Sequence, residues 1–160
     1  MHSIEFRRVP YAPQWSVEGG SIEVLAYLID GASFLESVRR AELPDALAEQ
    51  AERADEFAPD PAPLLAGTYM YAQGFSLEHL LGGKPDMVPH GAEEGETILL
   101  GCDCGIFDCW ALTATITAGE DTVTWSNLQN TYRDWNYDSI GTLTFSRRQY
   151  ETSWRTARFG

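Results

Sequence analysis

Three strand-like runs joined by short turns constrain the fold more than any other feature of this sequence. They cover residues 97–100, 110–117 and 122–125, and the middle run alternates apolar with small polar side chains. A four-residue turn separates the last two runs, and we expect Ile116 to face Val123 across it. Consecutive strands with turns this short pair as hairpins, so the sequence predicts an antiparallel sheet.

Other segments add further strands. Residues 4–9 predict a short strand that Pro10 ends, and residues 21–29 predict a strand that is buried on nearly both sides. Residues 140–145 predict a last strand, which is followed by a helix that begins at Ser146. The chain has no alternation of strand and helix and no G-x-G-x-x-G motif, so dinucleotide binding has no support.

Two more helices are expected before residue 60. Ser33 begins a capping box, so a helix starts there, and Pro44 is expected to end it. A second helix covers about residues 45–56 and leads into a proline-rich connector at residues 57–66. The expected fold is a single α+β domain over residues 1–160. It has a mainly antiparallel sheet of roughly five or six strands, with two or three helices packed on it.

The charge of the chain bears on its partners. The formal net charge is −13 at pH 7, which argues against nucleic acid, because a phosphate-binding surface needs a basic field. Residues 42–60 hold seven acidic side chains against the single Arg53. We expect these acids to form a solvated helical face, and the alternative is an acidic surface that meets a basic protein.

The sequence lacks the hydrophobic segments that direct proteins to membranes. It has no run of about 18 apolar residues, and residues 1–13 lack the apolar stretch of a signal peptide. We therefore expect a cytoplasmic protein with no membrane contact, in which thiols stay reduced.

All three cysteines lie in the motif GCDCGIFDCW at residues 101–110. One interpretation is a zinc site made by Cys102, Cys104, Cys109 and His90, since structural zinc takes four Cys or His ligands. The C-x-C-x4-C spacing is one ligand short, and residues two apart on a strand lie about 6.6 Å apart. The chain must therefore bend to bring the sulfurs to one ion, which the glycines of the motif permit.

Disulfide formation and thiol chemistry are two further interpretations. A Cys104–Cys109 bridge would close a small loop, but a permanent bridge does not suit a reducing compartment. Thiol catalysis needs a lowered cysteine pKa, whereas Asp103 and Asp108 beside the cysteines would raise it. The C-x-C spacing also differs from the C-x-x-C redox motif.

Core packing is the interpretation that the strand pattern favours. We expect Cys104 opposite Trp110 and Cys102 opposite Leu112, with residues 105–109 as the turn. The apolar faces of both strands then point into one core. Both sulfurs would be buried there as small apolar groups.

An aromatic cluster that contains one arginine lies between two predicted strands. It consists of Tyr132, Arg133, Trp135 and Tyr137. These residues form either a loop that packs its aromatic rings on the sheet or an interaction patch, because Trp, Tyr and Arg are enriched at interface hot spots. Both alternatives stay open from the sequence.

The C-terminal part of the chain contains several distinctive motifs. They are GCDCG-x3-CW within LLGCDCGIFDCWALTATI, the later Trp125, YRDWNY at residues 132–137, and an F-x-R-x-x-Y pattern from Phe145. This combination resembles a group of bacterial proteins of unassigned function over roughly the last 65 residues. The resemblance implies a bacterial origin, and it carries no activity, substrate or catalytic residue.

The absence of catalytic motifs shapes the expected function. Neither G-x-S-x-G nor H-E-x-x-H occurs, so we expect a non-enzymatic protein-interaction domain of an adaptor or immunity type. Its partner would be another protein, and a homodimer is compatible with this role. The alternative is a metal (zinc) or thiol protein built on Cys102, Cys104 and Cys109.

Overall fold

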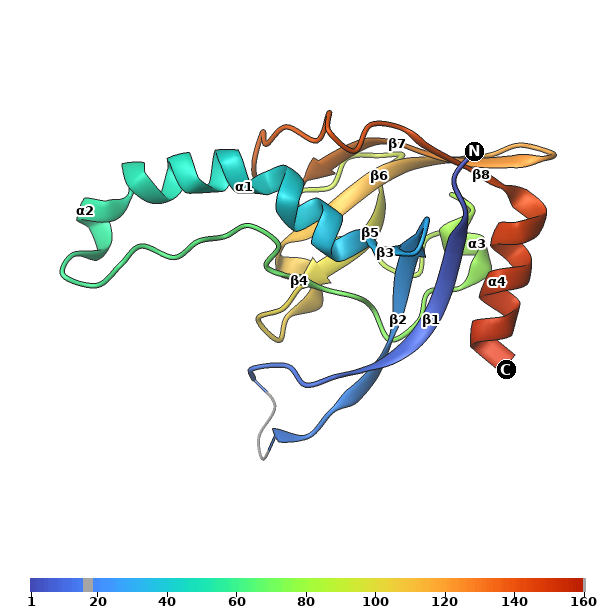
Figure 1. The fold of residues 1–160 in the computed structure, drawn as a ribbon, viewed down its shortest axis with the longest axis horizontal. Helices are drawn as coiled ribbons and strands as arrows, with labels where there is room; N and C mark the ends of the chain where they lie inside the picture. Colours follow the sequence, from blue (N-terminus) through green and yellow to red (C-terminus); the bar gives the residue numbers. More distant parts are fainter. Residues whose placement is uncertain (16–18, 160) are drawn as a thin grey trace.

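The computed structural model describes residues 1–15 and 19–159, and it has an α+β fold built on two antiparallel sheets (Figure 1). The first sheet has the order β1-β2-β3 and comprises β1 (Ile4–Tyr11), β2 (Ile22–Ile29) and β3 (Ala32–Ser33). The second has the order β4-β5-β6-β7-β8 and comprises β4 (Tyr69–Met70), β5 (Thr97–Cys102), β6 (Ala111–Ala118), β7 (Thr122–Asn130) and β8 (Leu143–Ser146). The expected α+β class with antiparallel pairing is confirmed.

Helices connect and cover the two sheets. They are α1 (Phe34–Glu52), α2 (Ala54–Phe57), α3 (Leu77–Leu80), the 3₁₀ helix η2 (Phe107–Cys109) and α4 (Arg147–Phe159). Figure 1 shows α4 beside β1, and it shows α1 projecting beyond the sheets with α2 at its far end. In the part of the chain that the structure describes, no helix combines the length and the apolar composition needed to cross a bilayer.

Among the residues that the structure describes, two backbone hydrogen bonds each join one sheet to a segment beside the other sheet. The Leu25 N–H on β2 donates to the carbonyl of Ala72, which follows β4, at 2.8 Å. The His2 N–H donates to the carbonyl of Thr144 on β8, also at 2.8 Å. The linked sheets enclose one hydrophobic core.

An aromatic cluster forms the centre of this core. The indole of Trp125 on β7 lies edge-to-face against Tyr27, Phe34 and Phe145, with ring centroids 5.6, 5.3 and 5.2 Å away. Each such pair contributes about 0.5–1.5 kcal/mol beyond the burial of its area. The indole N–H donates to the hydroxyl of Tyr150 on α4, so its polar atom is satisfied as well. Residues from both sheets and two helices therefore meet at one indole.

The prediction that Pro44 ends the first helix is wrong. Helix α1 begins after Ser33, whose hydroxyl accepts from the Glu36 N–H as expected, but it continues through Pro44 to Glu52. A proline inside a helix removes one backbone hydrogen bond. The side chains of Glu42 and Ala46, one on each side of the proline, are buried against the rest of the protein. Tertiary contact thus holds the helix together where local preference would break it.

Pro10 does not end the first strand either, because β1 extends to Tyr11. β1 is the edge strand of its sheet, so a residue that lacks an N–H is tolerated on its outer side. Helix α4 protects this outer side: the N–H groups of Ile4 and Phe6 donate to the side chains of Gln149 and Ser153. The edge is therefore not open to strand addition at these positions.

The predicted register of the β6–β7 hairpin is shifted by two residues. Ile116 pairs with Trp125 rather than with Val123, and Val123 pairs with Ala118. β6 runs to Ala118, so the turn is shorter than expected, and the Gly119 N–H closes it by donating to the carbonyl of Thr122 at 2.8 Å. Near the turn, a shift of two residues keeps Ile116 and Val123 on their predicted faces, and a register irregularity follows between Thr113 and Thr115.

The proline-rich connector returns from α2 toward β4 (Figure 1). Residues 58–65 have no helix or strand: residues 58–60 form a turn and a bend, and residues 61–65 follow without regular structure. The amide of Gln50 on α1 donates to the carbonyl of Ala62 at 2.9 Å, which ties the connector to the helix.

Candidate metal centre

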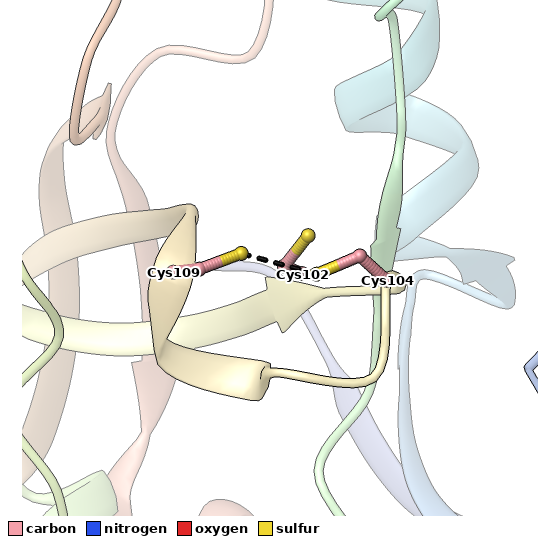
Figure 2. A group of neighbouring side chains, drawn as sticks. All are labelled: Cys102, Cys104 and Cys109. Atoms are coloured by element: carbon pink, nitrogen blue, oxygen red, sulfur yellow. Dashed lines mark hydrogen bonds between the residues drawn. The ribbon is translucent and has the colours of Figure 1, made fainter.

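The three cysteines converge at the connection between β5 and β6. Cys102 is the last residue of β5, Cys104 lies in the following turn, and Cys109 is the last residue of η2. Their sulfur atoms all lie within 4.8 Å of one another. Figure 2 shows the side chains of Cys104 and Cys109 pointing toward each other, with Cys102 beside them, and these two Sγ atoms are 3.1 Å apart.

Two local features fold the connection so that it brings the sulfurs together. Gly105 has a φ of +105°, which a residue with a side chain rarely adopts, and it reverses the chain after Cys104. The Phe107 ring then packs directly on Gly101, where a Cβ atom would lie 2.4 Å from the ring. The Cys109 N–H donates to the carbonyl of Ile106 at 3.2 Å and closes the 3₁₀ turn.

The packing interpretation holds for Cys102 but is wrong for Cys104. Leu100, not Cys102, pairs with Leu112, and the last pair of β5 and β6 is Gly101 with Ala111 rather than Cys104 with Trp110. Cys102 is 8% exposed, whereas Cys104 lies outside the strand and is exposed. The connection spans residues 103–110 and is not extended around Gly105, because the glycine and η2 bend it. The bend that a metal site requires is therefore present.

His90, the fourth member of the predicted zinc tetrad, does not join the sulfurs. Its backbone N–H donates to the carbonyl of Asp108 at 3.3 Å, so it lies near the cysteine loop. Its ring Nε2 is 3.9 Å from the Asp108 carboxylate, and its side chain is 77% exposed. Among the residues that the structure describes, the grouped ligand atoms are those of the three cysteines.

The three thiols differ in their pKa values. Burial, together with the contact with Cys104, raises the pKa of Cys102. The pKa of Cys104 is lowered, because its sulfur accepts hydrogen bonds from Cys102 and from Cys109. Burial raises the pKa of Cys109, and its contact with Cys104 adds to this effect. Cys104 is therefore the first of the three to become a thiolate, while the neighbouring Asp108 contributes to the raised pKa of Cys109.

Cys102 lies on the face of the sheet opposite a cavity that Gly105 and Phe107 of the cysteine loop help to line. Cys102 is directly opposite Tyr69 on β4 and shares its face, whereas Gly101 and its partner Met70 point the other way. A cavity of about 350 Å³ is lined on that other side by Met70, Phe107 and their neighbours, and by none of the cysteines. The sulfurs thus form a site outside this cavity, with Cys102 buried and Cys104 exposed.

The predicted interaction patch makes several contacts inside the protein. The Arg133 guanidinium donates to both carboxylate oxygens of Glu49 on α1, at 2.7 and 3.2 Å, and lies over the Trp110 ring at 5.4 Å. The Trp135 ring meets Trp110 edge-on at 5.7 Å. These are the contacts of a loop that packs its aromatic rings, and they join α1 to the residue after Cys109. Tyr132 differs, because it is 49% exposed.

Tyr137, the remaining member of that patch, contacts a buried carboxylate that the sequence did not indicate. Glu42 is 0% exposed, although it belongs to the segment predicted to be a solvated acidic face. The hydroxyls of Tyr69 and Tyr137 both donate to its Oε2 atom at 2.5 Å, and the Gly67 N–H donates to Oε1 at 2.8 Å. Burial raises the pKa of Glu42, and these hydrogen bonds partly offset that effect. Tyr69 and Tyr137 lie far from Glu42 in the sequence, so no local sequence pattern could have identified Glu42 as buried.

Comparisons of this chain with protein-family models, with curated proteins and with solved structures find no match. The resemblance to bacterial proteins therefore stays a prediction, and so does the protein-interaction role. The geometry of the cysteine cluster is the observation from which a function can be argued.

Proposed function

We propose that the protein binds a thiophilic metal ion, with zinc as the principal candidate, through the thiolates of Cys102, Cys104 and Cys109. The observation that supports this proposal is the convergence of three sulfurs from three different backbone environments. Packing alone explains a buried Cys102, but it does not explain why an exposed Cys104 and a half-buried Cys109 are held beside it.

The spacing of the sulfurs suits an ion of this kind. A zinc–sulfur bond is about 2.3 Å long, so sulfurs on one tetrahedral zinc lie about 3.8 Å apart. The Cys104 and Cys109 sulfurs are 3.1 Å apart, and all three sulfurs lie within 4.8 Å of one another, so these distances are close to that value. Small rotations of the side chains are sufficient to close the three sulfurs around an ion.

The cysteines would contribute differently to the site. Cys102 is held in the β5 ladder opposite Tyr69, so its sulfur is a fixed anchor. Cys104 and Cys109 belong to the loop that Gly105 and the Phe107 ring fold back, and they would close on the ion from the solvent side. Three protein ligands leave one position of a tetrahedral ion for water or another small ligand, as in zinc sites that are not purely structural.

Zinc titration of the reduced full-length chain against a chromophoric chelator tests the proposal. We expect about one zinc ion per chain, and we expect each of Cys102→Ser, Cys104→Ser and Cys109→Ser to weaken binding at least about a hundredfold. Substitution of residues that only hydrogen bond to metal ligands already costs about 10–100-fold in metal affinity, so loss of a ligand should cost at least as much.

The matched control is His90→Ala. The His90 ring lies toward Asp108 rather than with the sulfurs, so this variant should bind zinc as the parent does. Binding that depends on no cysteine would contradict the proposal. A large loss of affinity in His90→Ala would instead restore the four-ligand tetrad that the sequence suggested.

A further inference from the structure

We propose that Cys104 and Cys109 form a reversible disulfide, and that its formation removes the metal from the site. The disulfide itself follows from the geometry of the two thiols, while the release of metal rests on the proposed function. Both cysteines are free, and their two sulfurs are already in contact at 3.1 Å.

The loop geometry favours this pair over any pair that includes Cys102. A disulfide bond is about 2.05 Å long, so the Cys104 and Cys109 sulfurs need to approach by only about 1 Å. Both belong to residues 103–110, a connection outside the strand ladder, and its backbone can adjust without breaking strand pairs. Cys102 is buried and held in β5 opposite Tyr69, so its backbone cannot follow.

Exposure determines the order of the chemical steps. Cys104 is exposed and Cys109 is half-buried, so a hydroperoxide in solution reaches the Cys104 sulfur first. That sulfur attacks one peroxide oxygen, the O–O bond breaks, and a sulfenic acid and one molecule of water (or alcohol) result. The Cys109 sulfur then attacks the Cys104 sulfur, the S–O bond breaks, and a second water leaves with the Cys109 proton. Two thiols have lost two electrons, which the peroxide has gained.

The disulfide and the metal compete for the same atoms. Once Cys104 and Cys109 are joined, neither sulfur is a thiolate, and thiolates are the form of cysteine that binds metal. Cys102 alone would remain as a ligand, so the ion would leave. A reducing small thiol reverses the change by thiol–disulfide exchange, after which the three-sulfur site can form again.

The sequence allows the pairing to be mapped directly. A protease that cleaves before aspartate separates the three cysteines into the peptides Asp86–Cys102, Asp103–Phe107 and Asp108–Glu120. After treatment of the metal-free full chain with one equivalent of hydrogen peroxide and alkylation of the remaining thiols, we expect Asp103–Phe107 joined to Asp108–Glu120. Titratable thiols should fall from the three free cysteines to one. A bridge that includes Cys102, or stable oxidation of Cys104 without a bridge, would overturn the assignment.

Variants separate the disulfide from the metal site. Cys102→Ser should still form the Cys104–Cys109 bridge although it no longer holds zinc, while Cys104→Ser and Cys109→Ser should lose both. In the zinc-loaded parent, peroxide should release zinc in proportion to the bridge formed, and zinc that stays bound to the bridged protein would refute the coupling. If the chain forms the Cys104–Cys109 bridge but never takes up zinc, the disulfide assignment is supported and the proposed metal-binding function is refuted.

Discussion

At the scale of single residues, the core of this protein contains a buried carboxylate in addition to its apolar side chains. Glu42 is fully enclosed, and its carboxylate is satisfied by two tyrosine hydroxyls and one backbone N–H. A buried acceptor that loses a donor costs free energy, because the apolar surroundings offer no replacement. The two tyrosines come from β4 and from the loop after β7, so this carboxylate ties α1 to both.

Removing one of these donors tests the contribution of the network. Tyr137→Phe deletes the hydroxyl that donates to Glu42, and we expect the free energy of unfolding to fall by about 2 kcal/mol. The control is Tyr132→Phe in the same loop, because Tyr132 is exposed and its loss should change stability by less than about 0.5 kcal/mol. Urea unfolding followed by tryptophan fluorescence measures both. Equal stability of the two variants would contradict the claim that the Tyr137 hydroxyl stabilises the protein through Glu42.

At the scale of elements, the β5–β6 connection decides whether the sulfurs meet. Its shape depends on Gly101, since only a residue without a Cβ lets the Phe107 ring pack on the strand. η2 begins at Phe107 and ends at Cys109, so the position of that ring also sets the position of one sulfur. The geometry of the candidate site therefore follows from a packing contact on the opposite face of the sheet.

A single methyl group placed at this contact should disturb the site. In Gly101→Ala the new Cβ would lie 2.4 Å from the Phe107 ring, so η2 must move. We expect a loss of about 1–3 kcal/mol in stability. Zinc affinity should drop by about tenfold or more, because the Cys109 sulfur moves with η2. Gly74→Ala, where no atom lies within 4 Å of the added Cβ, should bind zinc as the parent does. Unchanged zinc affinity in Gly101→Ala would contradict the link between the ring and the sulfur.

The sequence predicted strand faces well and strand registers less well. Period-two alternation places Leu100 and Leu112 on one face, and the two residues pair directly across β5 and β6. Register depends on turn length, and next to each turn both hairpins are shifted by two residues because β6 extends to Ala118 and the β5–β6 connection is long; each ladder then has a further irregularity. Capping at Ser33 is local and was predictable, whereas continuation through Pro44 depends on tertiary contacts that no local pattern contains.

At the scale of the whole molecule, the balance of buried titratable groups sets the response to pH. His79 on α3 is fully buried, and its Nε2 hydrogen bonds to the carbonyl of Ile98 while its Nδ1 accepts from the Asp86 N–H. These partners fix a neutral ring with the proton on Nε2. Burial lowers the pKa of His79 below its ordinary value of 6.5, more than its hydrogen bond to Ile98 raises it.

The sign of the pH effect follows from this lowered pKa. The unfolded chain binds a proton at His79 at a higher pH than the folded chain does, so stability is present above about pH 6.5 and is lost as the pH falls through the folded pKa. We expect the free energy of unfolding to decrease between about pH 7 and pH 5. His79→Gln should remove much of this slope, while His90→Gln, at an exposed position, should keep it. A slope that is the same in all three proteins would rule out His79 as its source.

The central claim is that the three sulfurs form a metal site, and metal content measures it most directly. The full chain should be purified without added metal and without chelator, in parallel with Cys102→Ser, and both should be analysed for bound elements by mass spectrometry. The account predicts about one zinc ion, or another thiophilic ion, per parent chain and close to none in the variant. Equal metal content in the two proteins, or a parent that holds no metal and takes up none when zinc is offered, would contradict it.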